Sequence, residues 1–426
     1  MPSESFLELD LSIIFVLSVI LIWFMIFYQL ILTMAGFFHY RSSRKEKKKV
    51  DKLVFDFPRV TILIPAHNEE KVIAYTIEAM LKLEYPNDKL DILVINDGSS
   101  DHTADIVHGY AVKDSRLRLY NVPKGEGGKG KSRALNLGLK QTDAEYIAVY
   151  DADNTPDPSA LKYLMIQMLQ DQTLGAALGK FRTVNKKRNL LTRFINIETL
   201  GFQSMLQAGR WKMFKIATLP GTNLVIRRSL VNKLNGWDED AITEDSELSI
   251  RIYKEGYRIK YVPYSVTYEQ EPEAWNVWIK QRTRWVQGNN YVGKKFLKEI
   301  LSFKNKFLAI ELLYVFSLYY IFLVALVSSD LLFLLGVFNI VVINLSGPYT
   351  LVWIVGIILF LMEILLTLSY DREDTFSNIL IASLMYFTYC QVWIYIVGRA
   401  IYLDAIKKEK RTWVKTERFE VKPADK

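Results

Sequence analysis

Two long apolar stretches enclose a charged middle segment, and this pattern most constrains what the chain can fold into. Residues 11–38 are almost uninterrupted apolar sequence, and apolar sequence resumes at Phe307 and continues to about Leu403. A helix needs about 20 such residues to cross a bilayer. Hydrophobic residues make up 50% of the chain, more than in an ordinary soluble protein and fewer than in one that is all membrane. We therefore expect a soluble unit between membrane helices.

Charges beside the apolar stretches orient the chain. Acidic Glu4, Glu8 and Asp10 precede the first stretch, and the basic segment 41–49 follows it. Basic residues favour the cytoplasmic side and anionic lipid headgroups, so the middle segment is expected in the cytoplasm. A cleaved signal peptide is not expected, because the run is too long and no basic segment precedes it.

Four helices are predicted in the second apolar stretch, and they return the chain to the basic segment 407–411 in the cytoplasm. Their ranges are 307–327, 331–346, 350–369 and 379–403, with breaks at 328–330, 346–348 and 370–374. The second of them is short for a full crossing. The stretch after Asp374 has an alternative interpretation, in which it begins as an interfacial helix.

Charge and cysteine content exclude several classes. The net charge is +8, yet no recognisable nucleic-acid-binding module accompanies it, so nucleic acid is not an expected partner. Cys390 is the only cysteine, which excludes a disulfide framework and a cysteine-based zinc site.

The middle segment reads as alternating strands and helices. Strands are predicted at 59–64, 90–95 and 145–150, and helices at 68–83, 103–112 and 132–140. This alternation indicates an α/β fold with a parallel sheet and helices on its faces. Ligands bind beyond the carboxyl ends of such strands, where 65–69, 96–101 and 151–153 all lie.

Acidic residues at these strand ends point to metal and nucleotide chemistry. Asp151 and Asp153 directly follow a strand, and alternate carboxylates there can share Mg²⁺ or Mn²⁺ with phosphate oxygens. Asp97 is either a turn residue before glycine or an acceptor of hydrogen bonds from a base or ribose.

The glycine-rich, basic loop 124–131 precedes a helix, where backbone N–H groups favour phosphate. It lacks the Walker pattern of an ATPase loop. Lys129 is the candidate diphosphate contact, and a flexible solvated loop is the alternative.

Two later motifs each have a structural and a functional interpretation. Thr243-Glu-Asp245 precedes a predicted helix, where Asp245 is either a capping residue or a general base. Gln281-Arg-Thr-Arg-Trp285 lies in an aromatic, basic stretch typical of an interfacial helix. Arg284 could also clamp a diphosphate, and Trp285 could stack on a sugar ring.

Taken together, these motifs resemble family 2 glycosyltransferases of the processive, membrane-integrated kind, which include cellulose, hyaluronan and poly-N-acetylglucosamine synthases. The resemblance covers Val60 to about Gly293 and is nearest to the bacterial poly-N-acetylglucosamine synthases. It implies a cytoplasmic domain with the GT-A (nucleotide-diphospho-sugar transferase) fold. The implied divisions are a membrane helix at 1–40, the GT-A domain at 41–272, interfacial helices at 273–306, membrane helices at 307–403 and a basic tail at 404–426.

The resemblance also implies a role for each candidate residue. His67, Glu69, Asp97, Lys129, Asp151 and Arg284 would bind the donor, and Asp151 and Asp153 the metal. Asp245 would be the catalytic base, and Gln281, Trp285 and Thr222 would contact the acceptor. His67 departs from the Tyr that relatives often carry. The implied partners are a UDP-sugar, a growing polysaccharide, membrane lipids and, as a further candidate, a small accessory membrane subunit.

The implied activity is inverting, processive transfer from UDP-N-acetylglucosamine or UDP-glucose into a β-linked exopolysaccharide, with export of the chain. Two alternatives remain open at this point. One is a single transfer to a lipid-linked acceptor, and the other is a catalytically degenerate membrane scaffold or transport protein.

Overall fold

The computed structural model describes residues 2–123, 125–303, 306–341, 349–407 and 417–419. Its strands are β1 Val60–Ala66, β2 Leu90–Asn96, β3 Leu117–Asn121, β4 Tyr146–Val149, β5 Thr155–Pro156, β6 Leu174–Thr183, β7 Leu224–Arg227 and β8 Arg258–Glu269. Its helices are α1 Pro2–Val50, α2 Ile73–Leu81, α3 Thr103–Ala111, α4 Lys131–Leu139, α5 Ala160–Gln170, α6 Leu190–Gly201, α7 Ala208–Phe214, α8 Arg228–Lys233, α9 Glu244–Lys254, α10 Trp275–Phe296, α11 Lys306–Ser317, α12 Leu323–Val337, α13 Tyr349–Tyr370, α14 Phe376–Met385 and α15 Tyr389–Ile401.

One mixed sheet forms the core of the soluble part. Its strand order is β3-β2-β1-β4-β7-β6-β8-β5. Strands β3, β2, β1 and β4 run parallel, whereas β7 is antiparallel to both β4 and β6. The predicted parallel sheet is therefore confirmed for the first four strands only, because the later strands pair in both directions.

The predicted elements of the first half are confirmed, with one shortened helix. β1, β2 and β4 are buried on both faces, which explains why they read as continuous apolar runs. Helix α2 begins at Ile73 rather than at residue 68. Asn68 has a φ of 56°, and a left-handed residue cannot lie inside a right-handed helix.

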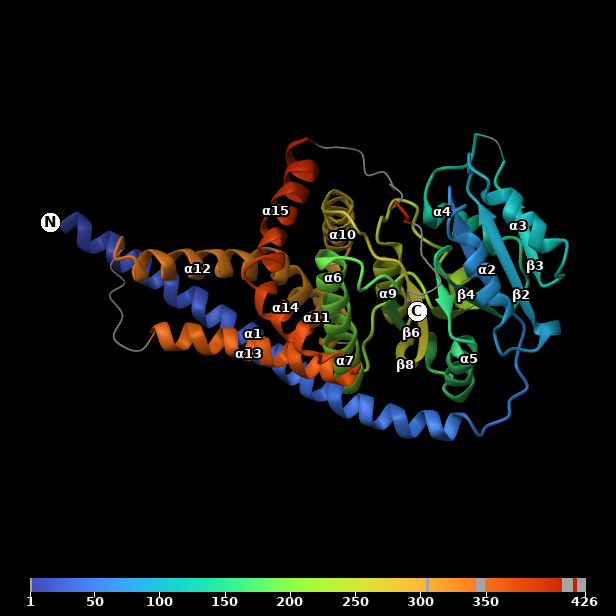
Figure 1. Ribbon diagram of the computed structural model, residues 1–426, viewed down its shortest axis with the longest axis horizontal. Coiled ribbons are helices and arrows are strands. Elements are labelled where there is room, and N and C mark those ends of the chain that lie inside the picture. Colours follow the sequence, from blue (N-terminus) through green and yellow to red (C-terminus); the bar gives the residue numbers. More distant parts are fainter. Residues whose placement is uncertain (1, 124, 304–305, 342–348, 408–416, 420–426) are drawn as a thin grey trace.

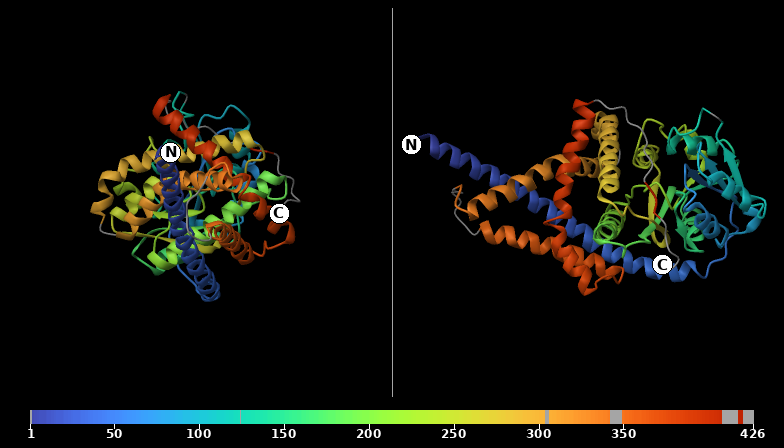
Figure 2. Two further views of the ribbon diagram at one scale, coloured as in Figure 1. Left: turned by 90° about the vertical axis from the view of Figure 1, so that its left-hand side faces the viewer. Right: turned by 45° about the horizontal axis from the view of Figure 1, so that its top comes forward.

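The elements lie in three layers (Figure 1). At one end, α12, α13 and the first part of α1 extend away from the rest of the molecule. The sheet and its covering helices form the other end. Between them, α6, α10 and α15 run across the direction of α1, and the views in Figure 2 show the same middle layer.

Three described helices are long and apolar enough to cross a membrane, by length and composition only. They are the spans Asp10–Val50, Lys306–Val337 and Leu351–Tyr370, and the bent pair α14 and α15 makes a fourth if counted as one span. The predicted break at 328–330 is wrong. Ser329 is fully buried within α12, and Asp330 accepts hydrogen bonds from Trp353 at 3.2 Å and Tyr386 at 3.1 Å, so these polar residues are accommodated inside the helix. Residues 342–346 of the predicted helix 331–346 lie outside the described residues.

Both ends of the bent pair α14 and α15 contact the soluble part. Before α14, Asp371 pairs with Lys180 of β6. After α15, Asp404 accepts hydrogen bonds from Gln287 at 3.0 Å and Asn290 at 3.1 Å, both on α10. The pair is therefore attached to the soluble part at both of its ends, and the interfacial alternative for the stretch after Asp374 stays a prediction.

Helix α1 continues past its apolar stretch along the soluble domain. Glu46 pairs with Lys260 of β8 at 2.7 Å, and Asp51 accepts a hydrogen bond from Tyr163 of α5 at 2.7 Å. Nearer the middle layer, glycines bring α1 against α7. A Cβ on Gly209 would lie 2.3 Å from the carbonyl oxygen of Leu32, so the two backbones touch. Such contacts are typical of helices packed within membranes.

We predict that Gly209→Ala destabilises the protein, because the added methyl group forces α1 and α7 apart. Overpacking of this kind costs about 1–3 kcal/mol. The check is the apparent melting temperature of the purified protein in detergent. Gly398→Ala is the matched control, since a Cβ there meets nothing within 4 Å. Equal melting temperatures for the two variants would contradict the close packing of α1 on α7.

Candidate active site

Asp97 holds the glycine-rich loop against the end of β2. Its Oδ1 accepts a hydrogen bond from the N–H of Gly128 at 3.0 Å, and its Oδ2 accepts one from Gly130 at 3.4 Å. The side chain is buried. Gly130 has a φ of 108°, a conformation open to glycine, and α4 begins at the next residue. The loop is thus shaped to aim the first residue of α4, Lys131, inward.

Lys131 connects three of the predicted motifs. Its Nζ lies 2.6 Å from Asp151 Oδ1 and 3.5 Å from Glu244 Oε1, and it donates a hydrogen bond to the carbonyl oxygen of Gly221 at 2.8 Å. Burial alone would lower the pKa of Lys131, but the two carboxylates raise it above its usual value. Lys131 is therefore a permanent positive charge at the carboxyl end of the sheet.

Asp245 lies beside the same lysine in the first turn of α9. A Cβ on Gly221 would sit 3.0 Å from Lys131 Nζ and 3.1 Å from Asp245 Oδ2, so both groups converge on this glycine. Burial, and then the neighbouring charge of Glu244, raise the pKa of Asp245 to about 7, although Lys131 acts against them. A carboxylate with this pKa can accept a proton near neutral pH.

Helix α10 packs directly on this acidic motif. A Cβ on Gly288 would lie 2.4 Å from Thr243 Cγ2, which shows how closely α10 approaches the start of α9. Arg284, one turn before Gly288, interacts electrostatically with Glu244 and Asp151. Trp285 follows it and is 39% exposed. The predicted aromatic and basic motif therefore borders the acidic site.

The end of the chain also reaches this site. Arg418 Nη1 lies 2.9 Å from Asp153 Oδ2 and donates to the carbonyl oxygen of Gln270 at 3.2 Å. The Gln270 side chain in turn makes two hydrogen bonds, of 2.9 and 2.7 Å, with the backbone of Phe419. The sequence analysis placed Arg418 in the basic tail at 404–426 and gave it no role, because nothing near it in the chain indicates this contact.

The other candidate donor residues lie on the same rim. His67 donates from Nδ1 to the backbone carbonyl oxygen of Asp97 at 2.7 Å. Glu69 is buried, and its Oε2 lies 3.9 Å from Arg418 Nε. Lys129, the candidate diphosphate contact, is exposed, whereas Lys131 reaches Asp151 and Glu244. Both lysines stay candidates for the diphosphate. Lys124 lies outside the described residues.

Two candidate acceptor residues have structural partners. Thr222 is buried, its Oγ1 accepts a hydrogen bond from the N–H of Asp151 at 3.1 Å, and it also bonds Asn154. Gln281 accepts from Arg282 Nη1 at 2.9 Å. Thr222 thus supports the turn that carries Asp151 and Asp153, and direct contact of either residue with an acceptor stays a prediction.

Asp151 and Asp153 fit a divalent cation shared with a nucleotide. Among the described residues, no three metal-ligating side chains form a ready cluster. A nucleotide site does not need one, because Mg²⁺ is commonly held by one or two carboxylates together with phosphate oxygens and water. Lys131 neutralises Asp151 and Arg418 neutralises Asp153, so a cation on Asp153 has to share or replace the arginine.

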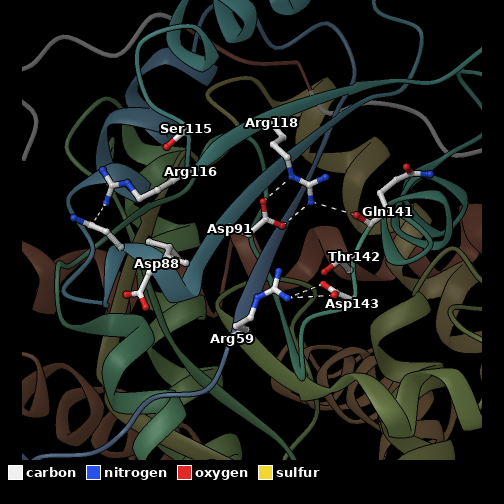
Figure 3. Close-up of a pocket in the computed structure, with 11 residues that line it drawn as sticks. Arg59, Asp88, Asp91, Ser115, Arg116, Arg118, Gln141, Thr142 and Asp143 are labelled. Carbon is white, nitrogen blue, oxygen red and sulfur yellow. Dashed lines mark hydrogen bonds and ion pairs between the residues drawn. The ribbon is translucent and has the colours of Figure 1, made fainter.

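A polar pocket of about 320 Å³ lies at the opposite edge of the sheet, by the amino ends of β1, β2 and β3 (Figure 3). Its arginines are already paired with aspartates. Arg59 lies 3.1 Å from Asp143, and Arg118 lies 2.6 Å from Asp91. None of the candidate site residues lines it. Its charges are balanced internally, and it is separate from the acidic site.

The comparisons with known proteins agree with this geometry. A model described as "Glycosyltransferase like family 2" matches residues 58–288. The chain belongs to glycosyltransferase family 2. A Bacillus subtilis protein named "Probable glycosyltransferase YdaM" is 44% identical over 410 residues, covering 95% of this chain and 98% of the relative. Residues 58–288 contain every candidate site residue predicted from the sequence. The family 2 resemblance is therefore confirmed, and the chain is a glycosyltransferase.

Two further proteins are similar to parts of this chain, one in sequence and one in fold. The poly-beta-1,6-N-acetyl-D-glucosamine synthase of Staphylococcus aureus is 34% identical over 245 residues, 58% of each chain. A Pyrobaculum calidifontis mannosyltransferase, solved with GDP-Man and Mn²⁺, has a TM-score of 0.53 and 23% identity, covering 85% of this chain and 99% of its own. The latter likeness shows the fold alone, and it confirms the expected GT-A architecture.

We predict that Lys131→Ala lowers kcat/KM for the nucleotide-sugar donor by about 100-fold, the usual cost of losing one group that stabilises developing charge. Lys129→Ala is the matched control and is expected to stay within about threefold, because its side chain is exposed. Donor turnover is measured by release of the nucleotide. Equal losses of kcat/KM in both variants would show that the activity depends on the loop as a whole rather than on Lys131.

The raised pKa of Asp245 predicts a pH dependence. If Asp245 must be deprotonated to act, kcat falls as the pH drops through about 7. Glu244→Gln removes the charge that raises this pKa, so the acidic limb of the pH profile moves to lower pH. Asp240→Asn, at an exposed position nearby, leaves the limb in place. An acidic limb that does not move in Glu244→Gln would contradict the assignment.

Proposed function

We propose that this protein is an inverting, processive glycosyltransferase that extends a β-linked exopolysaccharide from a UDP-sugar and exports it across the membrane. The observation that carries the proposal is the convergence of Asp245, Lys131 and Gly221 under α10, the helix that bears Arg284 and Trp285. The proposed base, the cations proposed to bind the donor and the helix proposed to bind the acceptor are thereby neighbours.

The chemistry assigns each residue one task. Asp245 takes the proton from the attacking sugar hydroxyl, which then displaces the nucleotide at the anomeric carbon with inversion. Lys131 and Arg284 stabilise the negative charge that develops on the departing diphosphate. Asp151 and Asp153 would hold Mg²⁺ or Mn²⁺, which supplies charge neutralisation at the diphosphate when bound. His67, Glu69 and Asp97 border the base and ribose.

Two relatives support parts of the proposal. The Staphylococcus aureus relative is named as a synthase of poly-beta-1,6-N-acetyl-D-glucosamine, which makes UDP-N-acetylglucosamine the first donor to test and UDP-glucose the second. The Pyrobaculum calidifontis enzyme was solved with Mn²⁺ and GDP-Man, which supports a divalent cation at a nucleotide-sugar site in this fold.

Processivity and export are inferred from the arrangement of α10. Trp285 is partly exposed, and its helix α10 lies in the middle layer, between the sheet and the candidate membrane spans (Figure 1). A sugar stacked on the Trp285 ring is held at the boundary between the catalytic domain and the bilayer. The basic residues at the end of α1 support a cytoplasmic position for the catalytic domain.

Asp245→Asn tests the chemistry. We expect it to abolish nucleotide release and polymer formation, because the neutral amide cannot accept the proton. Membrane insertion and the melting temperature should be unchanged, and Asp240→Asn should keep full activity. Full activity in Asp245→Asn would refute the assigned base.

Product length tests processivity. Purified protein is incubated with labelled UDP-N-acetylglucosamine, UDP-glucose or UDP-N-acetylmannosamine, and the products are resolved on a gel. We expect long products with one donor, and loss of all product when EDTA removes the metal, with recovery on adding Mn²⁺ or Mg²⁺. A product limited to one added sugar would defeat the processive proposal and favour single transfer to a lipid-linked acceptor. No turnover with any donor would favour the scaffold interpretation.

A further inference from the structure

Arg282 lies inside the acceptor motif, yet no role has been assigned to it. Its side chain is 1% exposed, although arginine is rarely buried without a partner. The neighbouring Arg284 faces the acidic site, whereas Arg282 points into the middle layer, toward α6 and α15. The two arginines of this motif therefore have different surroundings, and we expect them to have different roles.

The guanidinium of Arg282 covers one face of Trp285. Its Cζ lies 3.8 Å from the centroid of the indole ring and 5.9 Å from that of Trp278. A guanidinium stacked at this distance is held by the charge of the ring face as well as by contact. Trp285 as a whole is still 39% exposed, so part of the residue remains open to solvent beside this contact.

Glu198 and Tyr389 fix the guanidinium in turn. Arg282 Nη2 lies 2.6 Å from Glu198 Oε2. The hydroxyl of Tyr389 donates to the same carboxylate oxygen at 2.8 Å. The Tyr389 ring also packs on Trp278, with centroids 4.7 Å apart. The Glu198 carboxylate on α6 thus joins α10 to α15. It holds the guanidinium of Arg282 in one position, and the guanidinium in turn restricts the movement of the Trp285 ring.

We propose that Arg282, held by Glu198 and Tyr389, is a positioning residue that fixes the ring of Trp285 to receive the acceptor sugar. The inference rests on the proposed function, because it requires an acceptor to stack on Trp285. A ring already held in one orientation loses little freedom when the sugar binds, which strengthens acceptor binding without touching the donor. The ring is also tied to α15, the helix that follows the membrane spans.

Arg282→Lys separates positioning from charge. Lysine keeps the positive charge but has neither a flat group to stack on an indole nor a fork to hold a carboxylate. We expect the KM for an oligosaccharide acceptor to rise about tenfold and the products to shorten. The donor KM, and donor hydrolysis without acceptor, should stay within twofold, because the polar partners of Arg282 among the described residues are Glu198 and Gln281 and lysine keeps the charge.

Tyr389→Phe is a milder version of the same test. It removes one hydroxyl and keeps the ring, so a folded protein is expected even if Arg282→Lys proves unstable. The acceptor KM should rise about threefold, and in the double variant the two effects should be less than multiplicative, because both act through Glu198.

Arg193→Lys is the matched control. Arg193 also joins α6 to the α14–α15 pair, through hydrogen bonds to Ser377 at 2.8 Å and Asn378 at 2.7 Å, but it does not contact Trp285. A loss of general packing would affect this variant equally. We expect its acceptor KM to stay within twofold of the wild type.

The assay uses the full-length protein in detergent, with β-1,6-linked and β-1,4-linked N-acetylglucosamine oligosaccharides and cello-oligosaccharides as acceptors. If the wild type extends none of them, the proposed function and this inference fall together. If the wild type extends one and both Arg282→Lys and Tyr389→Phe keep its acceptor KM, only the inference is overturned. A parallel rise in donor KM would also overturn it, because that result indicates general damage to the site.

Discussion

The charge contacts of Lys131 are the interaction on which the rest of the site depends. Asp151 belongs to the end of β4, Gly221 to the loop before β7, and Glu244 to the first turn of α9, and all three meet one ammonium group. Without it, two carboxylates and a carbonyl oxygen would face one another in a buried space, a costly arrangement. Lys131 thereby connects the end of β4, the loop before β7 and the start of α9, and Asp245 lies beside this connection.

The two aspartates of the acidic site are already paired with cations before a charged ligand binds. Asp151 and Asp153 each have a cationic partner of a different kind: Lys131 is part of the GT-A core, whereas Arg418 comes from the end of the chain. A nucleotide diphosphate with a divalent cation would enter a region where these two carboxylates already have cationic partners. The arginine on Asp153 is the partner that can be exchanged without disturbing α4.

The sequence predicted the elements whose signal is local and missed those whose local signal is weak. β1, β2 and β4 were predicted correctly because both of their faces are buried, and Asp97, Asp151 and Asp153 follow from the ends of those strands. β6 and β8 were missed because β6 contains Gly175 and Gly179 and β8 contains Pro263, residues that are unusual inside strands. The inward position of Lys131 was not predicted, because it depends on the backbone of the glycine-rich loop, where Gly130 has a φ of 108°. Arg418 could not be predicted, since no nearby residue reports its ion pair with Asp153.

Helix α1 runs without interruption from Pro2 to Val50, through the apolar stretch and on along β8 and α5. A helix rises 1.5 Å per residue, so the part from residue 39 to residue 50 reaches about 18 Å beyond the last apolar residue. This segment acts as a rigid strut with fixed attachments at both ends. If the candidate spans cross a bilayer, this segment would keep the active site at a set height over it, and a thicker or thinner membrane would tilt the whole enzyme rather than separate its catalytic and apolar parts.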